Sequence, residues 1–272
     1  MLTSSTQASS QPKRQGPGTP LLSVASVVKR FGGQTAVDGL SFTVDRGEIV
    51  GLVGPNGAGK TTMFDCLAGS QRPTSGRIVL AGRAIDGLPA HARVALGLVR
   101  TFQIPRPFGS MSVVDNVMLG AQRQRGEVVW ANWLSYGAVR RQERETRERA
   151  MAQLEFTTLA HLAAQPAQVL SGGQRKLLEL ARVLMADPKL LLLDEPAAGV
   201  APALLDLVID RIAAIRDRGV TVLLIEHNMD MVARLCSRVL VMAQGRLLAE
   251  GTPAAVVREP AVVEAYLGAA AA

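Results

Sequence analysis

The stretch EIVGLVGPNGAGKTT, residues 48–62, decides the fold class of this chain. Its apolar run at residues 49–53 has the length of a buried strand, and a glycine-rich turn follows directly. The turn matches the pattern G-x-x-x-x-G-K-S/T and precedes a helical pattern over Met63–Ala68. A strand, a glycine-rich turn and a helix in this order predict a P-loop, a backbone cradle for the phosphates of a nucleotide.

The residue types in this turn suit phosphate binding. Glycines let backbone N–H groups close around phosphate oxygens, and the N-terminus of the next helix adds the positive end of its dipole. Lys60 is expected to reach the β- and γ-phosphates of ATP, and the hydroxyl of Thr61 to ligate Mg²⁺. The alternative, a turn without a ligand, fits poorly with a strand and a helix on either side. The predicted nucleotide-binding residues are Gly54, Pro55, Asn56, Gly57, Ala58, Gly59, Lys60, Thr61 and Thr62.

A second apolar run ends in two carboxylates. Leu190–Leu193 has the character of a buried strand, and Asp194 and Glu195 follow at its carboxyl end. Ligands bind at this end of the strands in open α/β sheets. We expect Asp194 to hold Mg²⁺ through water and Glu195 to act as the general base on the attacking water. Such a run is common by itself, but together with a P-loop it predicts a nucleotide-hydrolysing site.

The motif LSGGQ, residues 170–174, precedes a helical pattern over Arg175–Ala186. On local grounds alone, the preferred interpretation is that Ser171 caps this helix. A helix start rich in serine and glycine is also a second place where an anion can bind. One chain would then carry two phosphate-binding helix starts.

Strand patterns and helical patterns alternate along the chain. Beyond the P-loop strand, strands are expected at residues 40–44, 77–80, 190–193, 220–225 and 239–242. This alternation predicts an α/β domain with a largely parallel central sheet. Residues from about 105 to 167 show no clear strand pattern, and we interpret them as an inserted helical subdomain with Trp130 and Trp133 in a loop-rich middle.

Composition excludes several classes of protein. The chain has 272 residues, of which 48% are hydrophobic, so its bulk is not disordered. Cys66 and Cys236 are its two cysteines and do not form a disulfide framework. No run reaches the roughly 18–20 apolar residues that cross a bilayer. Residues 1–20 are mostly Ser, Thr, Gln, Pro and Gly, without the apolar segment of a secretory signal, and are predicted to be a disordered tail.

The net charge of +7 is compatible with a nucleic acid, an anionic membrane or an anionic small ligand as partner. Around residues 140–149, basic and acidic residues alternate in pairs such as Arg141–Glu145 and Glu143–Arg147, which is typical of a solvated helix face. Few aromatic residues lie among these charges, which argues against stacking on bases. Charge alone therefore does not identify the partner.

With these three motifs on one chain, the sequence resembles the ATP-binding cassette (ABC) ATPase family from about residue 21 to residue 267. The resemblance implies an α/β P-loop NTPase core with a mostly parallel sheet, an N-terminal antiparallel β portion and an inserted helical subdomain. It implies a single ABC ATPase domain over residues 21–268, with the helical subdomain at about 105–167. Residues 269–272 would be a short alanine tail.

The resemblance also implies roles for further residues. Gln103 matches the Q-loop glutamine, which touches Mg²⁺ and the attacking water, and His227 matches the switch histidine at the γ-phosphate. Phe31 matches the aromatic residue that stacks on adenine. Each of these two residues also has a structural alternative. The position of His227 also fits a surface histidine at a strand end, and that of Phe31 also fits a buried aromatic residue of the core. The implied Mg²⁺ residues are Thr61, Gln103 and Asp194, and those facing the ATP of a partner chain are Ser171, Gly172, Gly173 and Gln174.

At one position the sequence departs from the family pattern. After Glu195, most members carry an aspartate in a loop that crosses to the partner subunit, whereas this chain has Ala201. This puts communication between two ATP sites in doubt, although catalysis need not be affected.

A closer resemblance is to the ATPase subunits of bacterial branched-chain amino-acid importers. It rests on AVDGLSF at residues 36–42, VRTFQ at 99–103, EPAAG at 195–199, EHNM at 226–229, EGTP at 250–253 and AYLG at 265–268. It implies a second ABC ATPase subunit, forming a homodimer or heterodimer that sandwiches ATP, two membrane permease subunits, and a periplasmic solute-binding protein reached through the permeases. The chain would be soluble when isolated and peripheral on the cytoplasmic face of the inner membrane.

Other functions share the same ATP chemistry. Relatives within the group serve urea or short amides, and a lipopolysaccharide-export ATPase would carry the same motifs. A non-transport ABC ATPase acting on DNA or ribosomes fits less well. The segment between Lys60 and Ser171 lacks the sustained heptads of chromosome-maintenance members, and the translation-factor group has two cassettes per chain.

Overall fold

The computed structural model describes residues 19–101, 107–122 and 136–270. Gln103, Trp130, Trp133 and almost all of the predicted N-terminal tail lie outside the described residues. The described strands form two sheets, of four and six strands.

The four-stranded sheet is antiparallel and has the order β2-β1-β4-β5. Its strands are β1 (Leu22–Phe31), β2 (Gln34–Val44), β4 (Ser75–Leu80) and β5 (Arg83–Ala84). Leu40, Phe42 and Val44 alternate with exposed residues in β2, because successive side chains of a strand point to opposite faces. The expected N-terminal antiparallel portion is confirmed.

The six-stranded sheet has the order β10-β9-β3-β8-β7-β6 and is parallel except for β10, which runs antiparallel to β9. Its strands are β3 (Ile49–Val53), β6 (Leu98–Arg100), β7 (Leu190–Asp194), β8 (Thr221–Ile225), β9 (Arg238–Ala243) and β10 (Arg246–Gly251). All residues of β3, β7 and β8 are buried, as is usual for parallel strands covered on both faces. The mostly parallel central sheet is thus confirmed.

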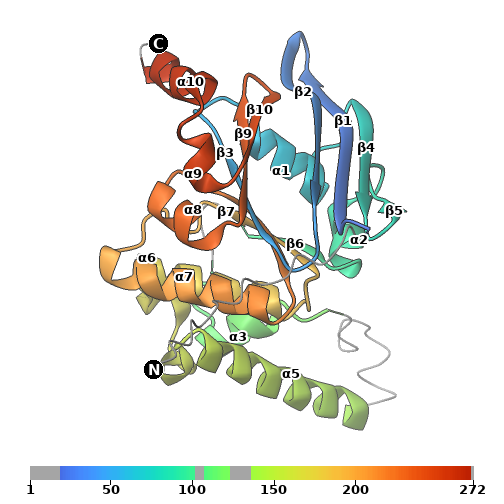
Figure 1. The fold of residues 1–272 in the computed structure, drawn as a ribbon. Helices are drawn as coiled ribbons and strands as arrows, with labels where there is room; N and C mark the ends of the chain where they lie inside the picture. The colour runs from blue at the N-terminus through green and yellow to red at the C-terminus, as the bar shows by residue number, and fades with distance from the viewer. Residues whose placement is uncertain (1–18, 102–106, 123–135, 271–272) are drawn as a thin grey trace, which may run out of the picture.

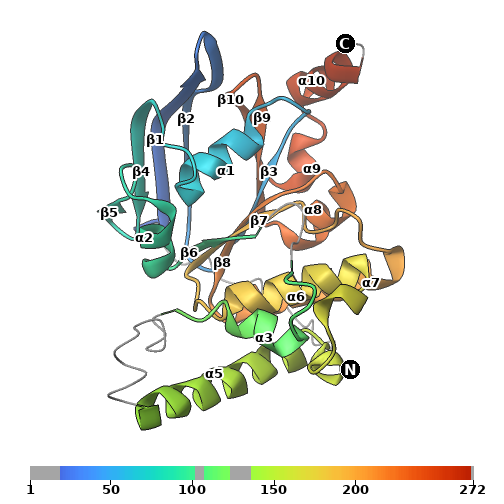
Figure 2. The same ribbon diagram turned by 180° about the vertical axis from the view of Figure 1, so that it is seen from behind.

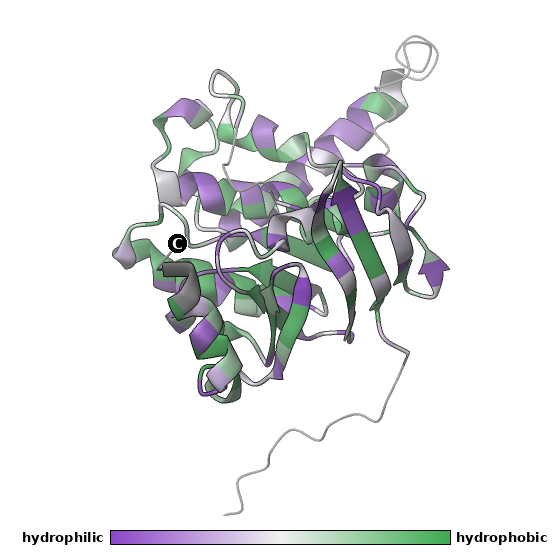
Figure 3. Cartoon of the chain, turned by 90° about the horizontal axis from the view of Figure 1, so that it is seen from above, coloured by the Kyte–Doolittle hydropathy of each residue, from purple (hydrophilic) through white to green (hydrophobic). Residues whose placement is uncertain are grey.

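Helices cover both faces of this sheet. The α-helices of the described residues are α1 (Lys60–Ala68), α2 (Ala90–Ala95), α3 (Val113–Met118), α5 (Tyr136–Phe156), α6 (Gly172–Leu184), α7 (Pro202–Asp217), α8 (Met229–Leu235), α9 (Pro253–Val256) and α10 (Pro260–Ala270). Helix α1 lies between the two sheets, whereas α3, α5, α6 and α7 lie beyond the other face (Figures 1 and 2). Figure 3 shows hydrophobic and hydrophilic segments along the same elements, as expected when one face is buried.

The strands divide the apolar interior into two cores. In β3, Val50 and Leu52 join the core that contains α1 and the antiparallel sheet, whereas Ile49 and Val53 join the core that contains α6 and α7. The period of two in a strand produces this division. The P-loop, which follows β3, is therefore held by packing from both sides.

Residues 107–122 and 136–167 contain α3, α5 and the short 3₁₀ helix η2 (Ala160–Leu162). On α5, the charged residues 143–145 are exposed, while Thr146 and Ala150 are buried, in agreement with the predicted solvated face. Among the helices in the described part of the chain, none combines the length and apolarity needed to cross a membrane.

Candidate nucleotide-binding site

The backbone between β3 and α1 forms a tight turn that needs its glycines. Gly54, Gly57 and Gly59 have φ values of +147°, +77° and +98°, a region that residues with a side chain rarely adopt. A Cβ atom at Gly54 would lie 2.0 Å from the carbonyl oxygen of Met242, and one at Gly59 would lie 2.2 Å from that of Ala36. No side chain caps α1, so its first N–H groups are available to a bound anion.

Lys60 folds back over this turn. Its Nζ donates hydrogen bonds to the carbonyl oxygens of Gly54, at 2.7 Å, and Pro55, at 2.9 Å. Burial lowers the pKa of Lys60, while the nearby carboxylates of Glu195 and Asp194 act to raise it. The structure therefore brings the P-loop cation close to both predicted acidic residues.

The P-loop borders a cleft of about 640 Å³. P-loop residues 56–62 line it together with Phe31, Glu195 and His227. The volume is within the range of small-molecule sites. Phe31 is 46% exposed and lies under the ammonium of Lys29, 4.7 Å from the ring centroid, so it is not a core residue.

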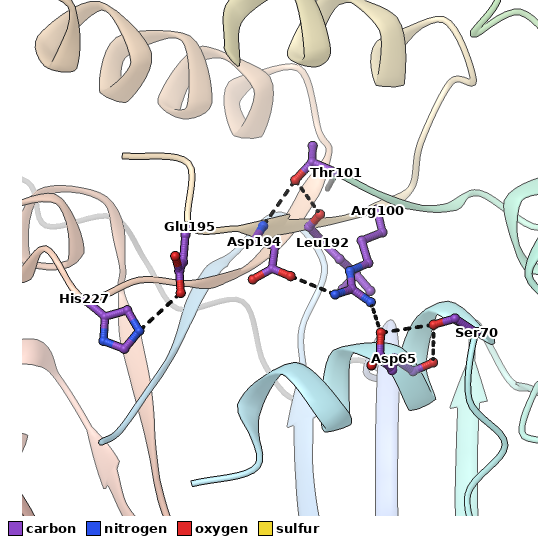
Figure 4. Close-up of polar contacts among 8 residues, drawn as sticks. All are labelled: Asp65, Ser70, Arg100, Thr101, Leu192, Asp194, Glu195 and His227. Atoms are coloured by element: carbon purple, nitrogen blue, oxygen red, sulfur yellow. Dashed lines mark hydrogen bonds and ion pairs between the residues drawn. The ribbon is translucent and has the colours of Figure 1, made fainter. Parts of the chain in front are cut away.

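The two acidic residues at the carboxyl end of β7 differ in burial and in their neighbours (Figure 4). Asp194 is buried, and its backbone N–H donates to the hydroxyl of Thr101, at 3.2 Å. Glu195 has a φ of +49°, which is rare for a residue with a side chain and is typical of functional sites. Its Oε1 is 3.4 Å from Nε2 of His227, so the proposed base and the proposed γ-phosphate residue are neighbours.

Glu226 connects the loops that carry these two residues, and the sequence motifs did not predict this role. The carboxylate is 3% exposed and accepts hydrogen bonds from the N–H groups of Ala197, at 2.6 Å, His227, at 2.9 Å, and Asn228, at 3.1 Å. It thereby joins the loop after β8 to the loop after β7. Its position beside His227 was the available signal.

Lys176 is a second residue near the acidic pair that the sequence motifs did not predict. It lies on α6, and its Nζ donates to the carbonyl oxygen of Glu195, at 3.1 Å. Burial lowers its pKa, while the carboxylates of Glu179 and Asp194 act to raise it. The helix that follows LSGGQ thus contacts the strand end that carries the acidic pair.

The LSGGQ motif begins α6 with a capping box. Oγ of Ser171 accepts from the N–H of Gln174, at 3.3 Å, and the N–H of Ser171 donates to Oε1 of Gln174, at 2.9 Å. The expected cap is therefore present. Ser171 and Gly172 are exposed, and among the described residues that line the cleft none belongs to 171–174.

The donor set indicates which metal the site can hold. Within the described part of the chain, no cluster of three or more His, Cys, Asp and Glu side chains could hold a metal ion. Mg²⁺ keeps several waters and is usually bound by a few protein oxygens together with substrate phosphates. Thr61, whose hydroxyl is an oxygen donor, lines the cleft, and the carboxylate of Asp194 stands at the end of β7, so the residues present suit Mg²⁺ with a nucleotide. Gln103, the third expected ligand, lies outside the described residues.

Comparison with known proteins gives the family. Residues 37–198 match the family described as ABC transporter, and residues 246–272 match the one described as branched-chain amino acid ATP-binding cassette transporter. The chain belongs to the ABC transporter family. It is an ATPase of that family, in which ATP hydrolysis is coupled to transport.

Individual relatives of this ABC ATPase cover nearly the whole chain. It is 43% identical over 250 residues to the high-affinity branched-chain amino acid transport ATP-binding protein BraF of Pseudomonas aeruginosa, with 92% of this chain and 98% of that protein covered. It is 40% identical to LivG of Escherichia coli, with the same coverage. The ADP conformation of MJ1267, an ATP-binding cassette of an ABC transporter, has a TM-score of 0.81 and 34% identity and covers 92% of this chain and 100% of that one.

Ala201 is the position at which the chain departs from the ABC pattern, and the start of α7 accommodates an alanine there. Ala201 is exposed at the N-cap of α7 and makes no side-chain capping hydrogen bond. Pro202 occupies the first position of the helix, where its fixed φ and missing N–H are favourable. The helix start is therefore compatible with alanine.

Proposed function

We propose that this chain binds and hydrolyses ATP with Mg²⁺ to energise the uptake of branched-chain amino acids. The observation that carries the proposal is the cleft that brings Phe31, the P-loop, Glu195 and His227 together. The names of the relatives and the match at residues 246–272 support branched-chain amino acids as the solute class.

In this proposal each side chain has a chemical task. The P-loop N–H groups and Lys60 bind the phosphates, and Phe31 stacks on adenine. Glu195 accepts the proton of the attacking water, and His227 contacts the γ-phosphate. Thr61, Asp194 through water, and Gln103 would hold Mg²⁺, which when bound neutralises charge on the phosphates.

We further propose that the site is completed by a second ABC ATPase subunit, identical or different. Residues 171–174 lie outside the chain's own cleft, and a helix start with exposed Ser171 and Gly172 is suited to the phosphate of a partner's nucleotide. The dimer would dock on two permeases at the cytoplasmic face of the inner membrane, with a periplasmic binding protein on their far side and no nucleic acid.

Replacing Lys60 with alanine is expected to weaken ATP binding by about 1.5–3 kcal/mol, because a charge-assisted contact to the β- and γ-phosphates is lost. Equilibrium binding of labelled ATP measures this. The matched control is Lys189→Ala, since Lys189 is exposed and precedes β7 at the end of the strand away from Asp194. Unchanged affinity in Lys60→Ala would contradict the phosphate-binding role.

The transport function is tested by reconstitution with the two permeases and a loaded binding protein. ATPase activity of the isolated chain is expected to be slow and to rise in the complex, because a site shared by two chains is incomplete until they are aligned. Loading with leucine, isoleucine or valine should stimulate hydrolysis, whereas urea or short amides should not. Stimulation by DNA or ribosomes instead would refute the importer function.

A further inference from the structure

Arg100, the last residue of β6, joins two carboxylates from different elements (Figure 4). Its Nη2 is 2.7 Å from Oδ2 of Asp194, and its Nη1 is 2.5 Å from Oδ1 of Asp65 on α1. Asp65 also accepts a hydrogen bond from the hydroxyl of Ser70, at 3.1 Å. The guanidinium thus connects the end of β7 to the helix that follows the P-loop.

The two carboxylates differ in exposure. The side chain of Asp194 is 2% exposed and that of Asp65 is 33% exposed, with Arg100 at 15%. A buried carboxylate is stable as an anion only when it is paired and hydrogen-bonded. Lys60 and Lys176 lie close enough to Asp194 for its charge to affect their pKa values, but Arg100 donates a hydrogen bond to it directly. Arg100 is therefore its hydrogen-bonded counter-ion.

The same carboxylate is required for the metal. In the proposed function, Asp194 holds Mg²⁺ through water, and a hydrated Mg²⁺ ion and a guanidinium compete for the oxygens of one carboxylate. Arginine does not give up its proton in proteins, so Arg100 cannot leave Asp194 by losing its charge. Asp65 offers it a second acceptor that does not depend on Asp194.

We propose that Arg100 is a positioning residue that pairs with Asp194 in the metal-free site and is retained by Asp65 when Mg²⁺ and ATP bind. Without the metal, Arg100 neutralises and orients the carboxylate of Asp194. Mg²⁺ must therefore displace Arg100 in order to bind there. This inference rests on the proposed ATP and Mg²⁺ site, and it concerns how strongly nucleotide binding depends on the metal.

The test compares the dissociation constant of ATP in EDTA with that in saturating Mg²⁺, for each protein, by equilibrium binding. The readout is the dissociation constant in EDTA divided by the dissociation constant in Mg²⁺. In Arg100→Gln, Asp194 repels metal-free ATP and no cation competes with Mg²⁺, so the ratio should rise about tenfold, the typical worth of one charged hydrogen bond. A role confined to tying β6 to α1 would change both constants alike and leave the ratio unchanged.

Two further variants sharpen the comparison. Asp65→Asn removes the negative charge of the second acceptor, so Arg100 should pair more firmly with Asp194 and the ratio should fall below that of the wild type. Arg238→Gln is the matched control, because Arg238 bridges Glu48 and Glu250 near the start of β9, at the opposite end of the sheet. Its ratio should equal that of the wild type.

Thermal melting establishes that each variant is folded. If Arg100→Gln does not fold, Arg100→Lys replaces it. An ammonium retains the charge but lacks the fork that holds two carboxylates, so it should stay on Asp194 and the ratio should fall below that of the wild type. An unchanged ratio in the folded Arg100 variant overturns the proposal, and a ratio in Asp65→Asn at or above that of the wild type overturns the transfer to Asp65. If wild-type binding of ATP shows no dependence on Mg²⁺, the proposed metal site itself fails.

Discussion

Replacing Glu195 with glutamine is expected to lower ATP hydrolysis about 10²–10⁴-fold, because the general base is lost. Glutamine retains the shape of the side chain and can still accept a hydrogen bond, so ATP and Mg²⁺ should bind as before. Single-turnover hydrolysis and equilibrium binding measure the two effects separately. Since bound ATP is not consumed, a nucleotide-bound dimer should also accumulate, which light scattering detects.

The structure supports this substitution as a clean test. Glu195 has a left-handed backbone and its side chain faces His227, 3.4 Å away, so a change of side-chain atoms need not disturb the loop. Glu143→Gln, on the exposed face of α5, is the control for removing a carboxylate elsewhere. Hydrolysis near the wild-type rate in Glu195→Gln would show that another group is the base.

The second large effect is expected from a mixture of Lys60→Ala and Ser171→Arg chains, which should recover the ATP hydrolysis and tight ATP binding that each variant lacks alone. In a site shared between chains, a mixed dimer places both lesions on one composite site. Its other site combines an intact Lys60 with an intact Ser171. Each homodimer, in contrast, carries a lesion in both sites. The measurement is ATP binding and hydrolysis by the two variants separately and after mixing.

The two roles of Ser171 predict different outcomes. If Ser171 only caps α6, Ser171→Ala should cost about 0.5–2 kcal/mol of stability and leave the chemistry unchanged. An intrachain site also predicts that mixing rescues nothing, because every chain in the mixture is defective. Absence of rescue, with mixed dimers shown to form, would therefore exclude the shared site. If the natural partner is a different ATPase subunit, the same lesions are divided between the two subunits.

Local motifs were predictable because their geometry is set within a few residues. The P-loop turn needs glycines at positive φ between a strand and a helix, and residues 54–59 supply them in order. The cap of Ser171 on Gln174 spans three residues and was expected from the sequence. The strand Leu190–Asp194 was visible because a parallel strand buried on both faces is a continuous apolar run.

Strands β5, β6 and β10 were missed for physical reasons. β5 has only two residues and β6 only three, too few for a periodic pattern. β10 alternates between half-buried and exposed residues, so its burial signal is weak. Gln244 and Gly245 connect it to β9 with φ values of +49° and +80°, as in a two-residue hairpin turn, but a Gln-Gly pair is a weaker signal than Asn-Gly.

Neighbouring residues alone specify the strand, turn and helix of the P-loop, the acidic pair at a strand end and the capped LSGGQ helix. Which side chains meet depends on tertiary packing, which pairs Arg100 with Asp194, 94 residues away, Glu195 with His227, and Glu226 with the loop after β7. These contacts depend on the order β3-β8-β7-β6 in the sheet. Strand order is set by packing of the whole chain, whereas turns and caps are set by neighbouring residues, so local patterns cannot specify it.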